Sequence, residues 1–305
     1  MRSAEAEARG GLDEALRHCE RIALQGKNNL FRAAQFLTAR TRYHLFTSTY
    51  ASMRVIDDAV DVSFLGLPAD ERERARPEAL RVVDRWEEQV ERAARGEFAA
   101  DGSAFEPAIF EVLNRYLPAS DLDVEPFRRL AAAMRHDVRE TELASWDDFL
   151  AYCEGASVAP ASVFIYILAC RLEGGERTSL DLPEPPESYA RAMARFCYCT
   201  HILRDLRKDA ARSPQLLTIP RRLLREAGHD AATFSRAVLA GDVAGIAPVT
   251  RTFVARAQEY AGEARRVLAG LEGRLGMREH RILWTLFHWY WKTFESVREE
   301  YAAAL

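Results

Sequence analysis

Residues 50–61 read YASMRVIDDAVD, and this stretch predicts the helix around which the chain is organised. Counting back from Asp57 at steps of three and four residues gives an apolar and aromatic stripe, the pattern of a helix face that packs into an interior. Asp57 therefore lies on the inward face, Asp61 follows one turn later on that face, and Asp58 points in another direction, where solvent can reach it. The stripe consists of Met53, Tyr50, Phe46 and Tyr43.

A second stretch, residues 195–209 with the sequence RFCYCTHILRDLRKD, repeats the arrangement. Asp205 and Asp209 are four residues apart and share a helix face, and His201 precedes them by one more turn. The adjacent face is apolar, so this helix is also expected to pack against the interior. That apolar face carries Phe196, Cys199, Ile202, Leu203 and Leu206.

Two carboxylate pairs in line with inward helix faces indicate a cation site. For one pair taken alone, an ordinary solvated helix surface is the competing interpretation. Carboxylates that face inward without partners are costly, so a cation is expected between the two helices. Hard carboxylate oxygens suit Mg²⁺, which keeps several waters and often bridges a protein to phosphate groups. Because the chain has no P-loop, metal and arginine are expected to hold any phosphate.

The composition indicates an all-α protein with a sizeable core. Of the 305 residues, 48% are apolar and 29% charged, and strong helix formers fill the long stretches between 16 glycines and 12 prolines. No strand-like alternation of apolar and polar residues stands out. We expect one domain over residues 1–305, with residues 1–26 as a peripheral N-terminal helix. Further helices are expected over 30–62, 79–94, 146–172, 188–211, 249–271 and 278–304, with loops at 65–69, 96–102 and 174–186.

Charge, cysteine use and hydropathy restrict the cellular setting. The 42 basic and 46 acidic residues nearly balance, so no nucleic-acid partner is expected. Five cysteines without a CxxC pair favour reduced thiols in the cytoplasm. The N-terminus has no apolar signal segment. The longest apolar run, residues 156–170, is interrupted by Pro160 and is shorter than a membrane span. A soluble cytoplasmic protein is expected.

At its acidic motifs the chain resembles the squalene/phytoene synthase family, the head-to-head trans-prenyltransferases. The first match is Tyr50, Arg54 and the DDxxD at 57–61, and the second is the ILRDxxxDA block at 202–210. Between them, residues 134–153 resemble the family's middle segment, an Asp-bearing helix followed by an acidic turn and a Tyr-Cys pair. Downstream, residues 219–228 resemble the segment after the second motif. Four ordered blocks agree in type and spacing, so the resemblance is specific.

The resemblance implies an isoprenoid-synthase-type helical bundle around a central apolar cavity, with both aspartate clusters at one end of the cavity. The implied catalytic residues are Tyr50, Arg54 and the four aspartates. By position, the resemblance implies Mg²⁺ ligands at Asp57, Asp61, Asp205 and Asp209, diphosphate contacts at Arg54 and Arg204, and contacts near the reacting carbons at Tyr50 and Phe31.

The chain departs from the family pattern beside the second motif. Tyr198 and His201 stand where the family usually has Gln and Asn, and both are expected to contact substrate there. A neutral imidazole can still ligate or donate a hydrogen bond, so the change at His201 does not by itself abolish metal binding. A soft-metal site formed by His201 with Cys197 or Cys199 is an alternative, although these ligands are few.

The expected activity is Mg²⁺-dependent condensation of two allylic prenyl diphosphates, C15 or C20, head to head through a cyclopropylcarbinyl diphosphate to a squalene- or phytoene-like product. Two alternatives stay open. One is other chemistry that ionises a prenyl diphosphate, by cyclisation or water capture. The other is a non-catalytic homologue that acts as a binding or assembly factor. The sequence leaves the need for NADPH and the oligomeric state open. Peripheral contact with the membrane is expected because the substrate is greasy.

Overall fold

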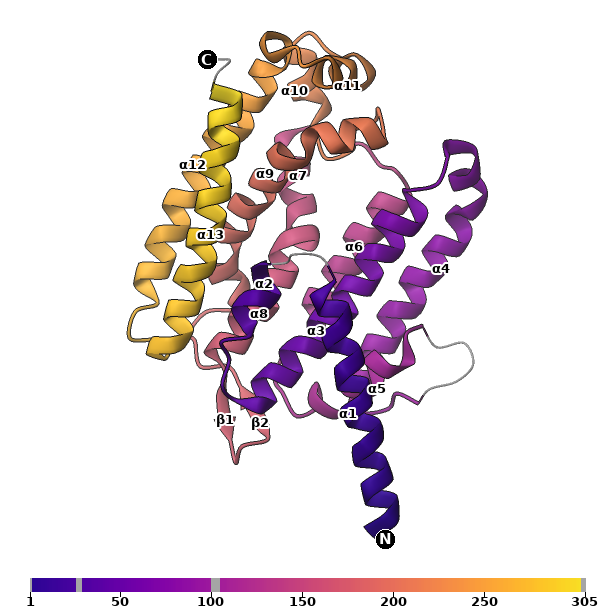
Figure 1. Cartoon of the computed structure of the whole chain (residues 1–305), viewed down its shortest axis with the longest axis vertical. Helices are drawn as coiled ribbons and strands as arrows, with labels where there is room; N and C mark the ends of the chain where they lie inside the picture. The colour runs from indigo at the N-terminus through magenta and orange to yellow at the C-terminus, as the bar shows by residue number, and fades with distance from the viewer. Residues whose placement is uncertain (1, 26–28, 100–104, 303–305) are drawn as a thin grey trace.

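The computed structural model describes residues 2–25, 29–99 and 105–302, and helices make up 76% of it (Figure 1). Two short π-helices interrupt the α-helices, and a small antiparallel hairpin accounts for the two strands among the described residues. The elements are α1 (Arg2–Leu24), α2 (Asn29–Ala34), α3 (Arg40–Asp58), η1 (Ala59–Phe64), α4 (Ala69–Ala94), α5 (Pro107–Tyr116), α6 (Glu125–Val138), α7 (Trp146–Cys153), η2 (Glu154–Val158), α8 (Ala159–Ala169), β1 (Arg171–Glu173), β2 (Arg177–Ser179), α9 (Pro186–Arg212), α10 (Arg221–Glu226), α11 (Ala231–Ala240), α12 (Val243–Gly270) and α13 (Met277–Ala302).

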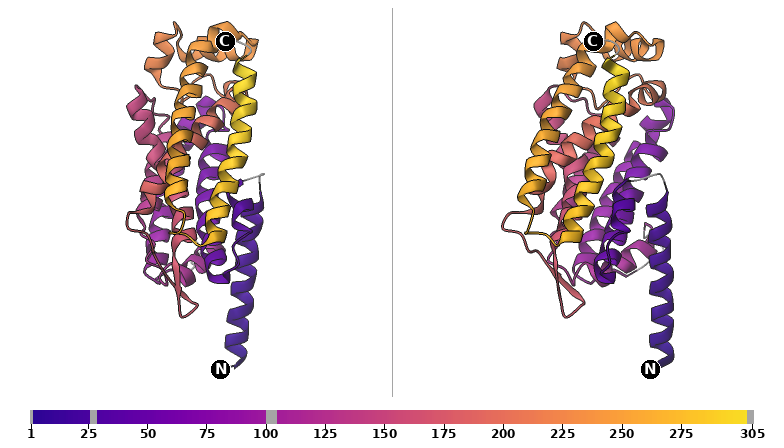
Figure 2. Two further views of the ribbon diagram at one scale, coloured as in Figure 1. Left: turned by 90° about the vertical axis from the view of Figure 1, so that its left-hand side faces the viewer. Right: turned by 60° about the vertical axis from the view of Figure 1, so that its left-hand side comes forward.

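The helices form a bundle whose centre is α8. This helix is almost entirely buried and packs against α3, α6 and α9. Helix α9 in turn packs against α12 and α13, which run side by side along one flank (Figures 1 and 2). Helices α10 and α11 lie at the end of the bundle opposite the β1–β2 hairpin, beyond which the N-terminal half of α1 projects (Figure 2). The all-α fold predicted from the sequence is confirmed.

Local signals account for several helix starts. Ser145 caps α7, because its hydroxyl accepts from the backbone N–H of Asp148 while the Asp148 carboxylate accepts from the Ser145 N–H. Asp230 caps α11 in the same reciprocal way with Thr233. Helix α9 begins with Pro186 and α6 has Pro126 as its second residue, and a proline in a first turn needs no hydrogen-bond acceptor for its nitrogen.

The predicted helix over 30–62 is wrong in one respect, because the chain turns between α2 and α3. Ala39 is extended, and the two helices take different directions because α2 packs on α13 whereas α3 packs on α1 and α5. The pattern also does not predict α5, α6, α10 or α11, which are only 6 to 14 residues long. Short helices depend on tertiary packing more than on their own propensity.

The segment formed by α7, η2 and α8 is long and apolar enough to cross a membrane, judged by length and composition only. The pair α11 and α12 would pass the same test if its 110° bend were disregarded. In the first segment, 56% of the apolar window is buried inside the bundle, which is typical of a core helix. The packing of α8 against α3, α6 and α9 explains why this segment is so apolar.

Candidate active site

The two predicted acidic motifs meet at one end of the bundle. Asp57 lies in the last turn of α3 and Asp61 in η1, so the helix changes from α to π between them. Asp209 lies in the last turns of α9, close enough to Asp61 for the charge of Asp61 to raise the pKa of Asp209. π-Turns inside α-helices frequently mark functional sites. The structure therefore brings both predicted carboxylate walls together.

A cavity of about 160 Å³ opens beside these carboxylates. Residues from η1, α4, α6, α7 and α9 line it, together with the loop that follows α9. A more open depression of about 490 Å³ lies elsewhere, at the β1–β2 hairpin, and contains none of the predicted site residues. The lining of the first cavity is Asp61, Leu65, Arg72, Asp137, Glu140, Tyr152, Tyr198, Asp209, Arg212, Ser213, Gln215, Leu216, Leu217 and Thr218.

The carboxylates repel one another. Burial, followed by the charge of Asp61, raises the pKa of Asp57 to about 7. Burial likewise raises the pKa of Asp61, although nearby cations oppose this shift. Burial and the charge of Asp205 raise the pKa of Asp209 to about 6. Raised carboxyl pKa values mean that the protein itself does not neutralise the ionised cluster, so the cluster favours binding of an added cation.

Asp137 on α6 forms a third acidic wall of the cavity, and no role was predicted for it from the sequence. Asp137 is only 6% exposed, and the Tyr152 hydroxyl donates a 2.8 Å hydrogen bond to its Oδ2. Burial and then the charge of Asp61 raise the pKa of Asp137 well above its ordinary value. The sequence does contain a signal that could have identified Asp137. It lies in the segment that resembles the family's middle block, on the buried face of an amphipathic helix.

The two predicted diphosphate arginines both contact neighbouring aspartates. Arg54 donates to both carboxylate oxygens of Asp58, with Nε at 2.9 Å from Oδ2, and its Nη1 lies 3.4 Å from Asp57. Asp58 keeps 32% of its side chain exposed beside this i,i+4 arginine partner. Arg204 donates to Asp205 at 3.0 and 2.6 Å. Burial raises the pKa of Asp205, but Arg204 outweighs it and the net shift is downward.

Aromatic side chains form an apolar wall next to Asp57. Phe31 and Phe46 are fully buried, and their ring centroids lie 6.3 and 5.5 Å from that of Tyr50. Phe164 of α8 meets Phe46 edge to face at 5.4 Å. Burial raises the pKa of Tyr50, so its hydroxyl stays protonated at neutral pH. Phe31 and Tyr50, predicted to lie beside the reacting carbons, thus belong to one aromatic cluster.

The two departures from the family pattern have different surroundings. Tyr198 lines the cavity and stacks on Phe149 at 5.9 Å. His201 instead packs against Tyr290 of α13, with ring centroids 5.2 Å apart. Burial and the charge of Arg204 lower the pKa of His201 to about 4. Its imidazole is therefore neutral at physiological pH, a state that the sequence could not define.

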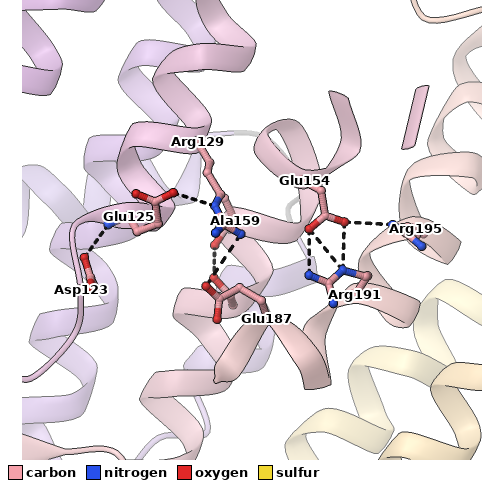
Figure 3. Close-up of polar contacts among 9 residues, drawn as sticks. Asp123, Glu125, Arg129, Glu154, Ala159, Glu187, Arg191 and Arg195 are labelled. Atoms are coloured by element: carbon pink, nitrogen blue, oxygen red, sulfur yellow. Dashed lines mark hydrogen bonds and ion pairs between the residues drawn. The ribbon is translucent and has the colours of Figure 1, made fainter. Parts of the chain in front are cut away.

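The π-turn η2, which follows Tyr152, is held on both sides. Glu154 accepts from Arg191 and Arg195 of α9 at 3.0 to 3.2 Å (Figure 3). A Cβ atom at Gly155 would lie 2.3 Å from the carbonyl oxygen of Arg129, so glycine allows η2 to approach α6 closely. These contacts fix the segment that carries Tyr152 between the helix of Asp137 and the helix of Asp209.

The carboxylate oxygens of this cluster fit a Mg²⁺ site in which the protein supplies only a few of the ligands. Within residues 2–25, 29–99 and 105–302, no three His, Cys, Asp or Glu side chains form a ready-made metal cluster. A soft-metal site at His201 with Cys197 or Cys199 therefore has no support from the geometry. Mg²⁺ needs only one or two carboxylates when waters and substrate phosphate complete its coordination. Asp57 and Asp209 meet that requirement, because each lies near another carboxylate and the surrounding protein does not fully neutralise their charges.

A helical bundle with two acidic helices close together at one end has the isoprenoid-synthase-type fold. The sequence model of the squalene/phytoene synthase family matches residues 24–300. The chain belongs to the squalene/phytoene synthase family, whose members are prenyltransferases. The predicted family, fold class and enzyme class are confirmed.

Individual relatives are distant. The chain is 25% identical to phytoene synthase 1 of Zea mays over 72% of this chain and 48% of that protein. It is 24% identical to 15-cis-phytoene synthase of Synechococcus elongatus over 67% of this chain and 61% of that protein. The matched region thus spans about half to three fifths of the length of these relatives.

Solved structures share the fold. The squalene synthase HpnC of Alicyclobacillus acidocaldarius superposes with a TM-score of 0.70 at 23% identity, covering 97% of this chain and 98% of that one. A dehydrosqualene synthase in complex with a ligand also gives 0.70, at 14% identity, covering 96% of this chain and 89% of that one. At these identities the likeness concerns the fold alone.

Proposed function

We propose that this protein is a Mg²⁺-dependent prenyltransferase that joins two allylic prenyl diphosphates, C15 or C20, head to head. The observation that carries the proposal is the group of carboxylates on α3, η1, α6 and α9 whose pKa values are raised by burial and by one another. Such a group requires cations, and it lies next to a buried aromatic wall. The names of the similar proteins support a squalene- or phytoene-type product.

Each wall of the site has its own part in the proposed reaction. Asp57, Asp61, Asp205 and Asp209 hold Mg²⁺, which when bound neutralises charge on the leaving diphosphate. Tyr50 and its aromatic neighbours exclude water from the allylic cation and offer it the faces of their rings. The cavity, about 160 Å³, is smaller than typical ligand pockets, so these side chains are expected to move when a prenyl chain enters.

The chemistry proceeds in two ionisations. The first substrate loses its diphosphate, and the double bond of the second captures the allylic cation with loss of a proton, which forms a cyclopropylcarbinyl diphosphate. A second ionisation releases the other diphosphate, and the rearranged cation gives a C30 or C40 hydrocarbon either by loss of a proton or, where NADPH is supplied as reductant, by gain of a hydride. The protein contributes preorganised electrostatics at the diphosphate and a dry, apolar environment for the cations.

Incubation with farnesyl or geranylgeranyl diphosphate and Mg²⁺, followed by mass spectrometry of the organic extract, tests the proposal. We expect a C30 or C40 product that is absent in EDTA and reduced by orders of magnitude in Asp57→Asn and Asp209→Asn. Parallel reactions with NADPH establish whether a reductant is needed. An alcohol or cyclised product would indicate the alternative ionising chemistry. If the folded protein releases no diphosphate from either prenyl substrate, that result would contradict catalysis and favour a binding or assembly role.

We further propose that residues 1–305 act as one catalytic domain in the cytoplasm, with peripheral contact to the membrane. The balanced charge of the chain and its expected apolar substrate support this setting. Cell fractionation followed by a salt wash of the membrane pellet tests it. We expect the protein in the soluble fraction or released by the wash, whereas retention after the wash would contradict a peripheral attachment.

A further inference from the structure

An exposed phenylalanine lies on the turn that joins α2 to α3. The side chain of Phe36 there is 53% exposed. The Arg32 guanidinium, one turn earlier, stacks over the ring of Trp289 on α13 at 4.7 Å. Just after the turn, Arg42 forms a 2.9 Å ion pair with Glu279 on the same helix. The turn is therefore held along α13, and Figures 1 and 2 show α2 and α13 together on one side of the bundle.

The face of α13 next to this turn is basic. Arg278, Arg281 and Lys292 are exposed, and their spacing places them on the helix face that carries Trp289. None of these three cations forms an ion pair with a residue that the structure describes. Met277, the first residue of the helix, is 75% exposed. This face therefore presents unpaired cations beside an exposed apolar side chain.

Charge is distributed unevenly along the chain, and the distribution makes this side of the bundle positive. The whole chain carries a formal net charge of -4, yet no acidic residue occurs between Glu20 and Asp57. That interval includes α2, so α2 brings no acidic side chain to the cations of α13. Glu279, the acidic residue in the first turn of α13, is paired with Arg42. Exposed apolar side chains among unpaired cations are the combination that binds anionic membrane surfaces.

Helix α2 also connects this side of the bundle with the aromatic cluster of the candidate site. Phe31 is buried on the inner side of α2, with its ring centroid 6.3 Å from that of Tyr50, whereas Arg32 is exposed on the outer side. A bilayer against the outer side of α2 would therefore lie only one helix away from the apolar wall of the site. Such a position gives an apolar substrate or product a short path between the bilayer and the site.

We propose that a surface formed by α2, the turn after it and α13 docks on an anionic lipid bilayer. The inference rests on the peripheral membrane contact proposed above and assigns that contact to one surface. Phe36 and Met277 enter the interfacial region, Trp289 lies at the level of the headgroups, and the cations contact lipid phosphates. This α2–α13 surface consists of Arg32, Phe36, Met277, Arg278, Arg281, Trp289 and Lys292.

The arrangement of the α2–α13 surface favours lipid over a protein partner. The centre of a protein–protein interface is depleted of charged residues, and lysine in particular is rare there. On the α2–α13 surface the cations instead lie among the exposed apolar side chains. A headgroup layer can satisfy both kinds of side chain at once, because phosphates meet the cations while the acyl boundary receives the apolar groups.

Co-sedimentation of the whole chain with protein-free vesicles tests the inference. One set of vesicles contains equal parts of phosphatidylglycerol and phosphatidylcholine, and the other contains phosphatidylcholine alone. We expect binding to the mixed vesicles that weakens as salt is added, and much weaker binding to phosphatidylcholine. Each lysine or arginine near an anionic surface contributes about fivefold to the partition coefficient. The double variant Arg281→Gln/Lys292→Gln should therefore lower the partition coefficient on mixed vesicles by about tenfold or more. Phe36→Ser and Met277→Ser should each lower it on both kinds of vesicle.

The matched control is Arg236→Gln/Leu239→Ser. Both residues are exposed on α11, at the end of the bundle opposite the β1–β2 hairpin, and neither belongs to the α2–α13 surface. We expect the partition coefficient of this control to stay within about twofold of that of the parent protein, with unchanged circular dichroism in every variant.

The possible results separate this inference from the proposals on which it rests. Parent-like binding of the folded α2–α13 variants, or an equal loss in the control, would overturn the inference and leave peripheral attachment intact. Binding of the parent protein to cell membranes but not to protein-free vesicles would indicate a protein partner and would also overturn it. Failure of the parent protein to bind either kind of membrane would overturn both the inference and peripheral attachment. Prenyl transfer is measured in solution without vesicles, so its outcome is independent of these results.

Discussion

Replacement of Glu154 by glutamine should destabilise the protein in a pH-dependent manner. The carboxylate of Glu154 joins η2 to α9 through Arg191 and Arg195 (Figure 3). Its side chain is 25% exposed, and those of Arg191 and Arg195 are 39% and 20% exposed. A hydrogen bond to a charged group contributes about 1.5–3 kcal/mol when buried, and an exposed ion pair contributes less than about 1 kcal/mol.

Because this cluster is only partly screened by solvent, we expect the free energy of unfolding of Glu154→Gln to fall by about 2 kcal/mol at pH 7. For a chain of this size the loss corresponds to a decrease of roughly 3 °C in Tm. Burial alone would raise the pKa of Glu154, but Arg191 and Arg195 outweigh it and lower the pKa. The stabilisation is therefore present above the unfolded-state pKa of about 4.3 and disappears as the pH falls through the lower folded-state value.

Denaturant unfolding followed by circular dichroism at several pH values between 7 and 3 provides the assay. The control is Glu259→Gln, which removes an exposed i,i+3 pair with Arg256 at 2.9 Å and should cost no more than about 0.5 kcal/mol. Two results would refute the reasoning. One is a loss in Glu154→Gln no larger than in Glu259→Gln. The other is a difference between parent and Glu154→Gln that stays constant as the pH falls.

Three further predictions concern the site and its support. In EDTA, Asp57→Asn should raise the free energy of unfolding at pH 8 by about 1 kcal/mol after allowance for solvent screening. The reason is that the pKa of Asp57 is raised to about 7 in the folded protein, so its ionisation costs stability as the pH rises from about 4 to 7. A lower free energy of unfolding of the variant at pH 8, measured by chemical denaturation, would contradict this. Gly155→Ala should lower the free energy of unfolding by about 1–3 kcal/mol, because its Cβ would meet the α6 backbone, whereas Gly262→Ala, with no contact nearer than 3.9 Å, should not. Proton NMR should find His201 neutral from pH 5.5 to 7.5, because burial lowers the pKa of its imidazole to about 4, and an imidazole titration inside that range would contradict this prediction.

Helical periodicity predicted the inward placement of the acidic residues because side-chain direction along a regular helix is a local property. Asp61 in η1 and Asp209 on α9 line the same cavity, as their spacing indicated. The partner of Arg54 was also within reach of local reasoning, since Asp58 is four residues away.

Contacts between distant segments were beyond such reasoning. Asp137 and Tyr152 are 15 residues apart and meet only because η2 packs closely on α6 at Gly155. The break between α2 and α3 depends on different packing partners for the two helices, and neither helix differs strongly in composition from its neighbour. Arg212 appears in the sequence as one of many arginines, and only the fold shows that it lines the same cavity as Asp61.

The sequence by itself determined the all-α class, the family and the two helices that carry the acidic pairs. These depend on residue type and on spacing within single helices, and both are local quantities. The tertiary structure decided which cations are already neutralised, which carboxylates crowd together and how strongly their pKa values shift. The reason is that burial and Coulomb interactions depend on the distances between groups, and these are set by the packing of helices far apart in the chain.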